Sequence, residues 1–148
     1  MNFKIRQLEA KDFKQSSFLE TLSNLSDVKN LSVKQAKEIF KRASGQGVYF
    51  LVALCEEGAH QGEIISTVKL IIEPKFFHGG KSAGHIEDVS TRYGFEGQGL
   101  SKALLQEAIK IAKENNCYKI ILDCKKELIP FYAKSGFKEH DICLRLDF

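Results

Sequence analysis

Apolar and polar positions follow two different periods along this chain, which predicts a protein of mixed strands and helices. Alternation or a short apolar run indicates a strand, whereas apolar residues three or four positions apart indicate a helix with one buried face. The expected strands are Phe3–Leu8, Val48–Cys55, Glu63–Glu73, Gly84–Thr91, Lys119–Cys124 and Ile142–Leu146. The expected helices are Lys11–Leu25, Ser32–Ala43, a segment that begins at about Leu100, and Leu128–Ser135.

Two helix ends carry specific signals. Ser32 and Gln35 have the spacing of a capping box, in which each side chain bonds to the backbone N–H of the other. Gly136 follows the last expected helix and is typical of a residue that ends one. In the helix after Ser32 we expect a buried face made of Ala36, Ile39 and Phe40.

The order of the elements predicts how the strands pair. The turn at Gly58–Gly62 joins two strands as a hairpin, so they should be antiparallel. A helix separates the fourth and fifth strands, and such a crossover gives parallel pairing. We therefore expect an α/β protein with a central mixed sheet and helices on both faces, folded as one domain over residues 1–148.

Composition and charge exclude several classes of protein. The chain is 43% hydrophobic and 28% charged, as ordinary globular proteins are, and its net charge of +3 is too small to indicate a nucleic-acid partner. No apolar run is long enough for a membrane helix, and Met1–Arg6 lacks a signal-peptide core. We expect a cytoplasmic protein whose Cys55, Cys124 and Cys143 are buried free thiols. No metal site is expected, because His60, His85 and His140 have no ligand spacing.

The glycine-rich segment Glu96–Ser101 is the strongest chemical signal. It follows a strand and opens an amphipathic helix, so free backbone N–H groups should point outward at a position that favours anions. Glycines there let the backbone approach a ligand closely. The segment fits neither the Rossmann nor the P-loop pattern. The residues alone leave two interpretations open: a phosphate or pyrophosphate site, or a plain turn before a helix.

Carboxylates in the predicted strands are a second signal. Glu87 and Asp88 are adjacent, so on a regular strand their side chains should face opposite sides of the sheet. Burying a carboxylate is costly without a charged partner, and a substrate ammonium would be one. An ion pair with Lys69 or Arg92 is the alternative. Asp123 poses the same question in the strand that precedes the last helix.

Four blocks of sequence carry a family resemblance. Glu96–Ser101 resembles the acyl-CoA pyrophosphate loop of the GNAT superfamily, whose pattern is Gln/Arg-x-x-Gly-x-Gly/Ala. GHIED at 84–88, NCYKIILDC at 116–124 and PFYAKSGF at 130–137 look like the glucosamine 6-phosphate N-acetyltransferases of that superfamily. The resemblance spans nearly the whole chain. It implies the GNAT fold, acetyl-CoA as cosubstrate, glucosamine 6-phosphate as acceptor on the way to UDP-N-acetylglucosamine, direct attack by the amine, no metal, and a homodimer that shares its sites.

The resemblance also implies roles for individual residues. Tyr132 takes the position of the tyrosine that faces the CoA sulfur, and Glu87, Asp88 and Asp123 take those of carboxylates near the amine. Residues that match cofactor contacts are Val89, Ser90, Glu96, Gly97, Gln98, Gly99, Leu100, Ser101, Tyr132 and Lys134. Residues that match sugar contacts are Lys75, Phe76, Phe77, His78, Glu87, Asp88, Tyr118, Lys119, Asp123 and Arg145, with Ser26 near a sugar-contacting threonine.

Two positions depart from the family pattern. Glu96 stands where Gln or Arg is usual, and Ser101 where Gly or Ala is usual. A carboxylate beside a pyrophosphate should weaken its binding, so Glu96→Gln should tighten it unless the side chain points to solvent. Two other functions stay open: a GNAT-fold acetyltransferase of peptide or polyamine amines, and a non-catalytic acyl-CoA-binding domain. Glu96 favours the second of these, whereas Tyr132 and the three carboxylates argue against it.

Overall fold

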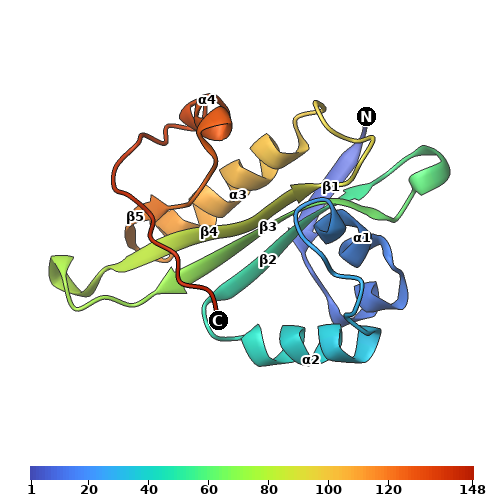
Figure 1. The fold of residues 1–148 in the computed structure, drawn as a ribbon, viewed down its shortest axis with the longest axis horizontal. Helices are drawn as coiled ribbons and strands as arrows, with labels where there is room; N and C mark the ends of the chain where they lie inside the picture. Colours follow the sequence, from blue (N-terminus) through green and yellow to red (C-terminus); the bar gives the residue numbers. More distant parts are fainter.

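A computed structural model describes all 148 residues and shows one five-stranded sheet (Figure 1). The strands lie in the order in which they occur along the chain. They are β1 (Phe3–Gln7), β2 (Val48–Cys55), β3 (Ile64–Glu73), β4 (Ser82–Thr91) and β5 (Cys117–Ile121). Strands β1 to β4 pair antiparallel, and β4 and β5 pair parallel. The mixed sheet expected from the sequence is therefore confirmed.

Helices cover both faces of the sheet (Figure 1). The α-helices are α1 (Ser17–Ser23), α2 (Val33–Ala43), α3 (Leu100–Glu114) and α4 (Ile129–Ala133). Short 3-10 turns are η1 (Ala10–Lys14), η2 (Gly58–His60), η3 (His78–Gly80) and η4 (Lys126–Leu128). One core lies between the sheet and α3 with α4, and includes Leu70, Leu104 and Tyr132. A smaller core on the other face joins η1, α1 and α2 to the sheet.

The helix signals read from the sequence are largely confirmed. The Ser32 side chain accepts from the backbone N–H of Gln35, whose own side chain accepts from the N–H of Ser32, so the capping box forms. Gly136 has a φ of 91°, in the left-handed region that favours glycine. Ala36 is buried as expected, but Ile39 is exposed because α2 contacts the rest of the chain along a narrower stripe.

Three predicted elements are wrong in their extent. The helix expected over Lys11–Leu25 is broken into η1 and α1, because the backbone is extended at Gln15. The strand expected at Lys119–Cys124 instead covers Cys117–Ile121, since its partner on β4 stops pairing at His85. The strand expected at Ile142–Leu146 is absent, because no strand of this chain lies beside it to supply hydrogen bonds.

The cysteines only partly follow the prediction. All four are free, and Cys55 is buried against the core. Cys124 and Cys143 are exposed, because both lie outside the sheet in segments that were expected to be strands. Their apolar sequence neighbours therefore did not indicate burial.

Helix α1 is short but firmly attached to the sheet. It is only seven residues long, too short to be stable by itself. The Thr21 hydroxyl, fully buried, donates to the carbonyl of Ile64 at 2.9 Å, and the backbone N–H of Ile64 donates to the Ser17 hydroxyl at 3.2 Å. The Ser90 hydroxyl of β4 donates to the carbonyl of Thr21 at 2.6 Å. These buried bonds fix α1 to both β3 and β4.

Candidate functional site

The start of α3 presents a run of free backbone donors. Gly99 is the N-cap, with a φ of 80° and no side-chain cap, and the first bond of the helix runs from the N–H of Ala103 to the carbonyl of Gly99. The backbone N–H groups from Gly97 to Lys102 therefore have no acceptor within the chain. A Cβ built at Gly97 or Gly99 would meet open space. Such a helix N-terminus suits a pyrophosphate, so the residues present fit the group that the sequence predicts.

The two departures from the family pattern are both hydrogen-bonded within the chain. One oxygen of the Glu96 carboxylate accepts from the backbone N–H of Gly94 at 2.7 Å, and the other accepts from the side-chain amide of Asn24 at 3.2 Å. Backbone N–H groups, that of Glu96 itself foremost, hold the pKa of this carboxyl below its usual value. The Ser101 hydroxyl bonds to that of Thr91 at 2.7 Å. Sequence reasoning missed Asn24, because nothing local distinguishes it from other polar residues at a helix end.

Beside this loop, β4 and β5 separate. Their pairing runs from Ser82 with Cys117 to His85 with Ile121, while β4 continues to Thr91 without a neighbouring strand on that side. Val89 and Ser90, which match cofactor contacts, lie on this unpaired part of β4. The opening leads from the free donors of α3 along the edge of β4. An extended chain of atoms could therefore bond to the backbone there, as an added strand would.

The paired carboxylates of β4 do not sit as predicted. Asp88 has a φ of 51°, within a bulge where the β3–β4 register shifts. Lys69 lies opposite Glu87 in the register, so these two side chains share a face, and the Lys69 ammonium contacts Asp88 at 2.5 Å. The prediction of opposite faces is wrong, because the bulge brings Asp88 to the side of Lys69 as well. The ion pair left open from the sequence is present, and Glu87 is exposed.

Asp123 lies just beyond the end of β5, not within a strand, and it is exposed. The Cys143 thiol of the C-terminal tail donates to its carboxylate at 3.3 Å. This hydrogen bond is the main cause of a raised pKa of Cys143, with smaller effects of the Asp123 and Glu87 charges. His85 lies opposite Ile121 in the parallel register, so Glu87 and Asp123, each two residues further along, lie at the same end of the opening.

Tyr132 is the buried member of the four residues predicted to take part in catalysis. Its side chain belongs to the α3–α4 core and packs edge-on against Phe131 and Phe137, at ring distances of 5.0 and 6.0 Å. Only 7% of the residue is exposed. The hydroxyl makes no hydrogen bond within the chain, so it is available to a ligand. Burial, and to a lesser extent the nearby Cys124, raises the pKa of Tyr132, which keeps its hydroxyl protonated.

A second group of predicted residues lies at the far end of β5. The ring of His78 in the β3–β4 loop stacks on Tyr118 with 4.0 Å between centroids, and the Lys119 ammonium lies 5.5 Å from the centre of the Tyr118 ring. Phe76 and Phe77 of the same loop are exposed, and Lys75 bonds to Glu73. Along an extended chain Tyr118 and Asp123 are roughly 16 Å apart. The structure therefore does not bring the His78 group to the carboxylate end of its own chain.

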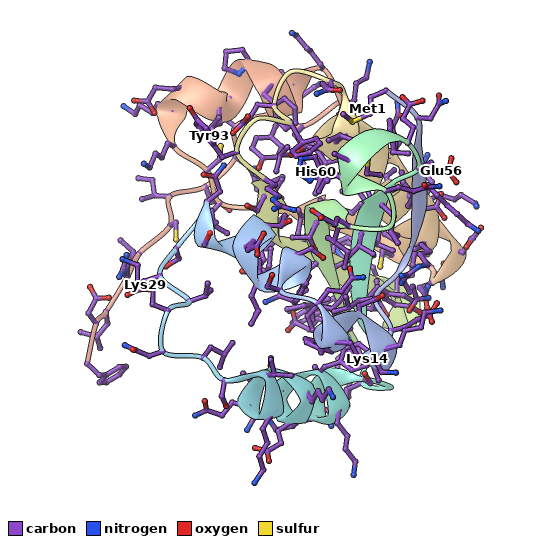
Figure 2. The ribbon with its side chains drawn as sticks, turned by 90° about the vertical axis from the view of Figure 1, so that its right-hand side faces the viewer. Met1, Lys14, Lys29, Glu56, His60 and Tyr93 are labelled. Atoms are coloured by element: carbon purple, nitrogen blue, oxygen red, sulfur yellow. The ribbon has the colours of Figure 1, made fainter.

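Three other predicted residues lie on exposed segments. Arg145, 83% exposed, bonds to Asp147 at 2.6 Å on the irregular tail, which projects from the sheet (Figure 2). Lys134 follows α4 without a side-chain partner. Ser26 lies in the α1–α2 loop, where Ser23–Lys29 line a shallow hollow of about 420 Å³. None of the three forms a side-chain hydrogen bond or ion pair with another predicted site residue.

Comparison with known proteins places these features in a family. The acetyltransferase (GNAT) family model matches residues 7–137. A glucosamine 6-phosphate N-acetyltransferase of Trypanosoma brucei brucei is 37% identical over 99% of this chain and 97% of its own length. The crystal structure of glucosamine-6-phosphate N-acetyltransferase from Arabidopsis thaliana has a TM-score of 0.90 and 33% identity, covering 100% of this chain and 99% of that one.

A more distant solved structure extends the likeness in fold. It is a predicted acetyltransferase with acetyl-CoA from Clostridium acetobutylicum, with a TM-score of 0.72 and 22% identity over 99% of this chain and 96% of its own. None of the helices in the present chain has the length and apolar character needed to cross a bilayer.

Proposed function

Because the chain belongs to the acetyltransferase (GNAT) family, we propose that it transfers the acetyl group of acetyl-CoA to the amine of glucosamine 6-phosphate. The product would be N-acetylglucosamine 6-phosphate, a precursor for UDP-N-acetylglucosamine. The whole chain, residues 1–148, would act as a single domain. The observation that carries the proposal is the run of free N–H groups from Gly97 to Lys102 at the mouth of the β4–β5 opening.

The donor site would use backbone more than side chains. The pyrophosphate of acetyl-CoA would accept from the Gly97–Lys102 N–H groups, and the helix dipole of α3 would add to the attraction. The edge of β4 at Val89 and Ser90 would bond to the pantetheine amides. Lys134, which directly follows α4 and is exposed, would supply a positive charge to the cofactor. Bound acetyl-CoA supplies an activated thioester whose acetyl group can pass directly to an amine.

The acceptor site would use the carboxylates at the opening. An amino sugar arrives largely as an ammonium, which Glu87, Asp88 and Asp123 would attract and orient. Asp88 already holds a cation, Lys69, at 2.5 Å, so this position accommodates an ammonium group. A carboxylate of the set would accept the amine proton, directly or through water. No histidine bonds to a serine or cysteine, so nothing supports a covalent enzyme intermediate.

Tyr132 would serve the leaving group. Its hydroxyl is free of protein partners, and burial keeps it protonated, so it can donate a hydrogen bond or a proton to the departing thiolate. The surrounding Phe131 and Phe137 rings hold the tyrosine in place. The phosphate of the sugar would bind Arg145, with Lys119 as a second cation.

A homodimer would complete the acceptor site. Phe76 and Phe77 are exposed, as are the apolar side chains of the tail, namely Ile142, Leu144, Leu146 and Phe148. Surfaces of this kind usually belong to interfaces. The loop with Lys75–His78 lies away from the carboxylates of its own chain, so in a two-fold dimer it would contribute to the partner's site. Sedimentation should then give twice the mass of the chain.

An amine panel tests the substrate. Thiol release from acetyl-CoA should be fast with glucosamine 6-phosphate and slow with glucosamine, spermidine and peptides. The contrast between the sugar phosphate and glucosamine isolates the phosphate contact. Turnover of spermidine or a peptide instead would mean that the acceptor is a polyamine or a protein amine. CoA binding without any turnover would favour a non-catalytic acyl-CoA-binding domain. The feature that favoured this last alternative, Glu96, already accepts hydrogen bonds from Gly94 and from Asn24 of α1.

A further inference from the structure

Glu96 turns back onto the start of its own loop. Its two carboxylate oxygens accept from Gly94 and Asn24, and it contacts none of the N–H groups from Gly97 to Lys102. The position where the family pattern has Gln or Arg is therefore used here to hold the chain just before the pyrophosphate donors. A carboxylate can do this because it accepts two hydrogen bonds on separate oxygens.

Asn24 is the other half of this contact. It is the C-cap of α1, and its amide nitrogen donates both to Glu96 and to the carbonyl of Thr91 at 2.7 Å. A second link joins the same two segments, since Arg92 forms ion pairs with Glu20 of α1 at 2.6 Å and with Glu63. The loop is thus attached to α1 at its beginning, on either side of Tyr93, which is labelled in Figure 2.

The base to which the loop is attached is rigid. Buried hydrogen bonds of Ser17, Thr21 and Ser90 fix α1 to β3 and β4, as described above. The loop itself contains Gly94, Gly97 and Gly99, all with positive φ. Glycine has the largest conformational freedom to lose, so ordering this loop at the moment of binding would weaken affinity. An attachment formed beforehand removes part of that cost.

We propose that Glu96 is a positioning residue, which with Asn24 clamps the start of the loop to α1 and so preorganises the Gly97–Lys102 donors for acetyl-CoA. This inference rests on the proposed donor site. It reverses the expectation from the sequence, in which Glu96 repels the pyrophosphate. The lowered pKa of Glu96 agrees with a carboxylate that stays ionised and keeps accepting both bonds at neutral pH.

The clamp and the repulsion interpretations of Glu96 predict opposite changes in CoA affinity for Glu96→Gln. The glutamine oxygen can accept from Gly94, but its amide group then faces the Asn24 amide, a donor against a donor. Asn24 cannot flip without losing its bond to Thr91. Calorimetry with CoA should show binding weaker by about three- to tenfold, roughly one exposed charge-assisted hydrogen bond. Tighter binding would overturn the clamp and support repulsion.

Asn24→Ala tests the clamp without changing charge. It should weaken CoA binding by a similar factor, and the double variant with Glu96→Gln should be no weaker than Asn24→Ala alone, because the two act through one contact. Glu38→Gln on α2 matches the charge change at a distance and should leave the affinity unaltered. The KM for acetyl-CoA should rise in both loop variants while kcat changes little, and melting temperatures confirm folding.

Each failure points to a different conclusion. Wild-type protein that does not bind CoA in the calorimeter would reject the proposed donor site, whatever the variants do. Wild-type protein that binds CoA, with Asn24→Ala and Glu96→Gln binding equally well, would reject the clamp alone. Additive losses in the double variant would also reject it, because the two residues would then act separately.

Discussion

The β4–β5 opening has a donor end, proposed to bind acetyl-CoA, and an acceptor end, proposed to bind the sugar. The two ends differ in how much of each site a single chain supplies. The donor end comprises α1, the loop 92–99 and the start of α3, and its side chains are bonded to one another through Asn24, Glu96 and Arg92. The acceptor end has the carboxylates Glu87, Asp88 and Asp123. The other residues proposed for the sugar lie on the distant loop 74–81, at the start of β5 and on the tail 138–148, and large apolar side chains of this loop and tail are exposed. The donor end leaves a run of backbone N–H groups free and exposes one large side chain, Tyr93, whereas the acceptor end exposes several large apolar side chains.

This difference indicates which end of the opening, the donor end or the acceptor end, would depend on dimer formation. A donor site built from backbone and anchored on buried hydrogen bonds needs no second chain. The proposed acceptor site, whose Tyr118–His78 group and carboxylates lie at opposite ends of β5, would need one. We therefore expect cofactor binding to survive in a monomer and sugar turnover to require the dimer. The following predictions test that division, from the largest expected effect to the smallest.

Tyr132→Phe should have the largest effect. Removing the hydroxyl takes away the donor to the departing thiolate, so kcat should fall by roughly 10- to 1,000-fold. The KM for acetyl-CoA should hardly change, because the ring and its packing remain. Steady-state kinetics of both substrates gives the split. An unaltered kcat would remove Tyr132 from the mechanism.

Arg145→Ala should affect the acceptor end alone. Loss of a guanidinium that binds a phosphate through charge-assisted bonds should lower kcat/KM for glucosamine 6-phosphate by about 100-fold. The KM for acetyl-CoA should stay the same, because Arg145 lies on the tail. Lys138→Ala, which removes an exposed charge from the same tail, is the control. A loss shared equally by both substrates would indicate damaged folding instead.

Mixed dimers show whether the acceptor end is shared. Tyr132→Phe and His78→Ala chains are each prepared alone and then mixed and reassociated in equal amounts. If the loop acts on the partner's site, half of the dimers should be mixed and half of their sites intact, which gives about a quarter of wild-type activity. Activity no higher than the average of the two parents would mean that each loop serves its own chain.

The free energy of unfolding should also be more sensitive to a substitution at the donor end than to one at the acceptor end, and this is the smallest of the expected effects. Thr21→Val at the donor end removes a buried donor and leaves the Ile64 carbonyl without it, so unfolding should cost about 1–3 kcal/mol less. Lys69→Gln removes a pair in which Lys69 is 23% and Asp88 43% exposed, and the cost should stay below about 1 kcal/mol. Urea denaturation measures both. Equal losses would mean that α1 is not the firmer attachment.

Local sequence predicted those parts of the fold that depend on neighbours along the chain. The bounds of β2 follow from the apolar run Val48–Cys55, and α2 begins where Ser32 and Gln35 form a capping box. The glycine-rich loop before α3 and its free donors were also evident from residue order. Each of these features is stabilised by contacts within a few residues or by burial of a continuous run.

The features that the sequence did not predict depend on distant partners. The bulge at Asp88 arises from the register of β4 against β3, and no local pattern encodes its positive φ. The segment Ile142–Leu146 alternates as a strand would, yet a strand also needs a neighbour, and this chain offers none. The Asn24–Glu96 contact joins residues far apart in sequence, so only the folded chain shows why Glu96 fits.

The strictly sequential order of the strands has a consequence for synthesis of the protein. Each strand pairs with the one made just before it, so the sheet can grow in the direction of translation without waiting for a later segment. The loop 92–99 and α3 leave the ribosome before β5, α4 and Tyr132. A nascent chain would therefore form the proposed pyrophosphate site before Tyr132, the proposed partner of the leaving group, has been made.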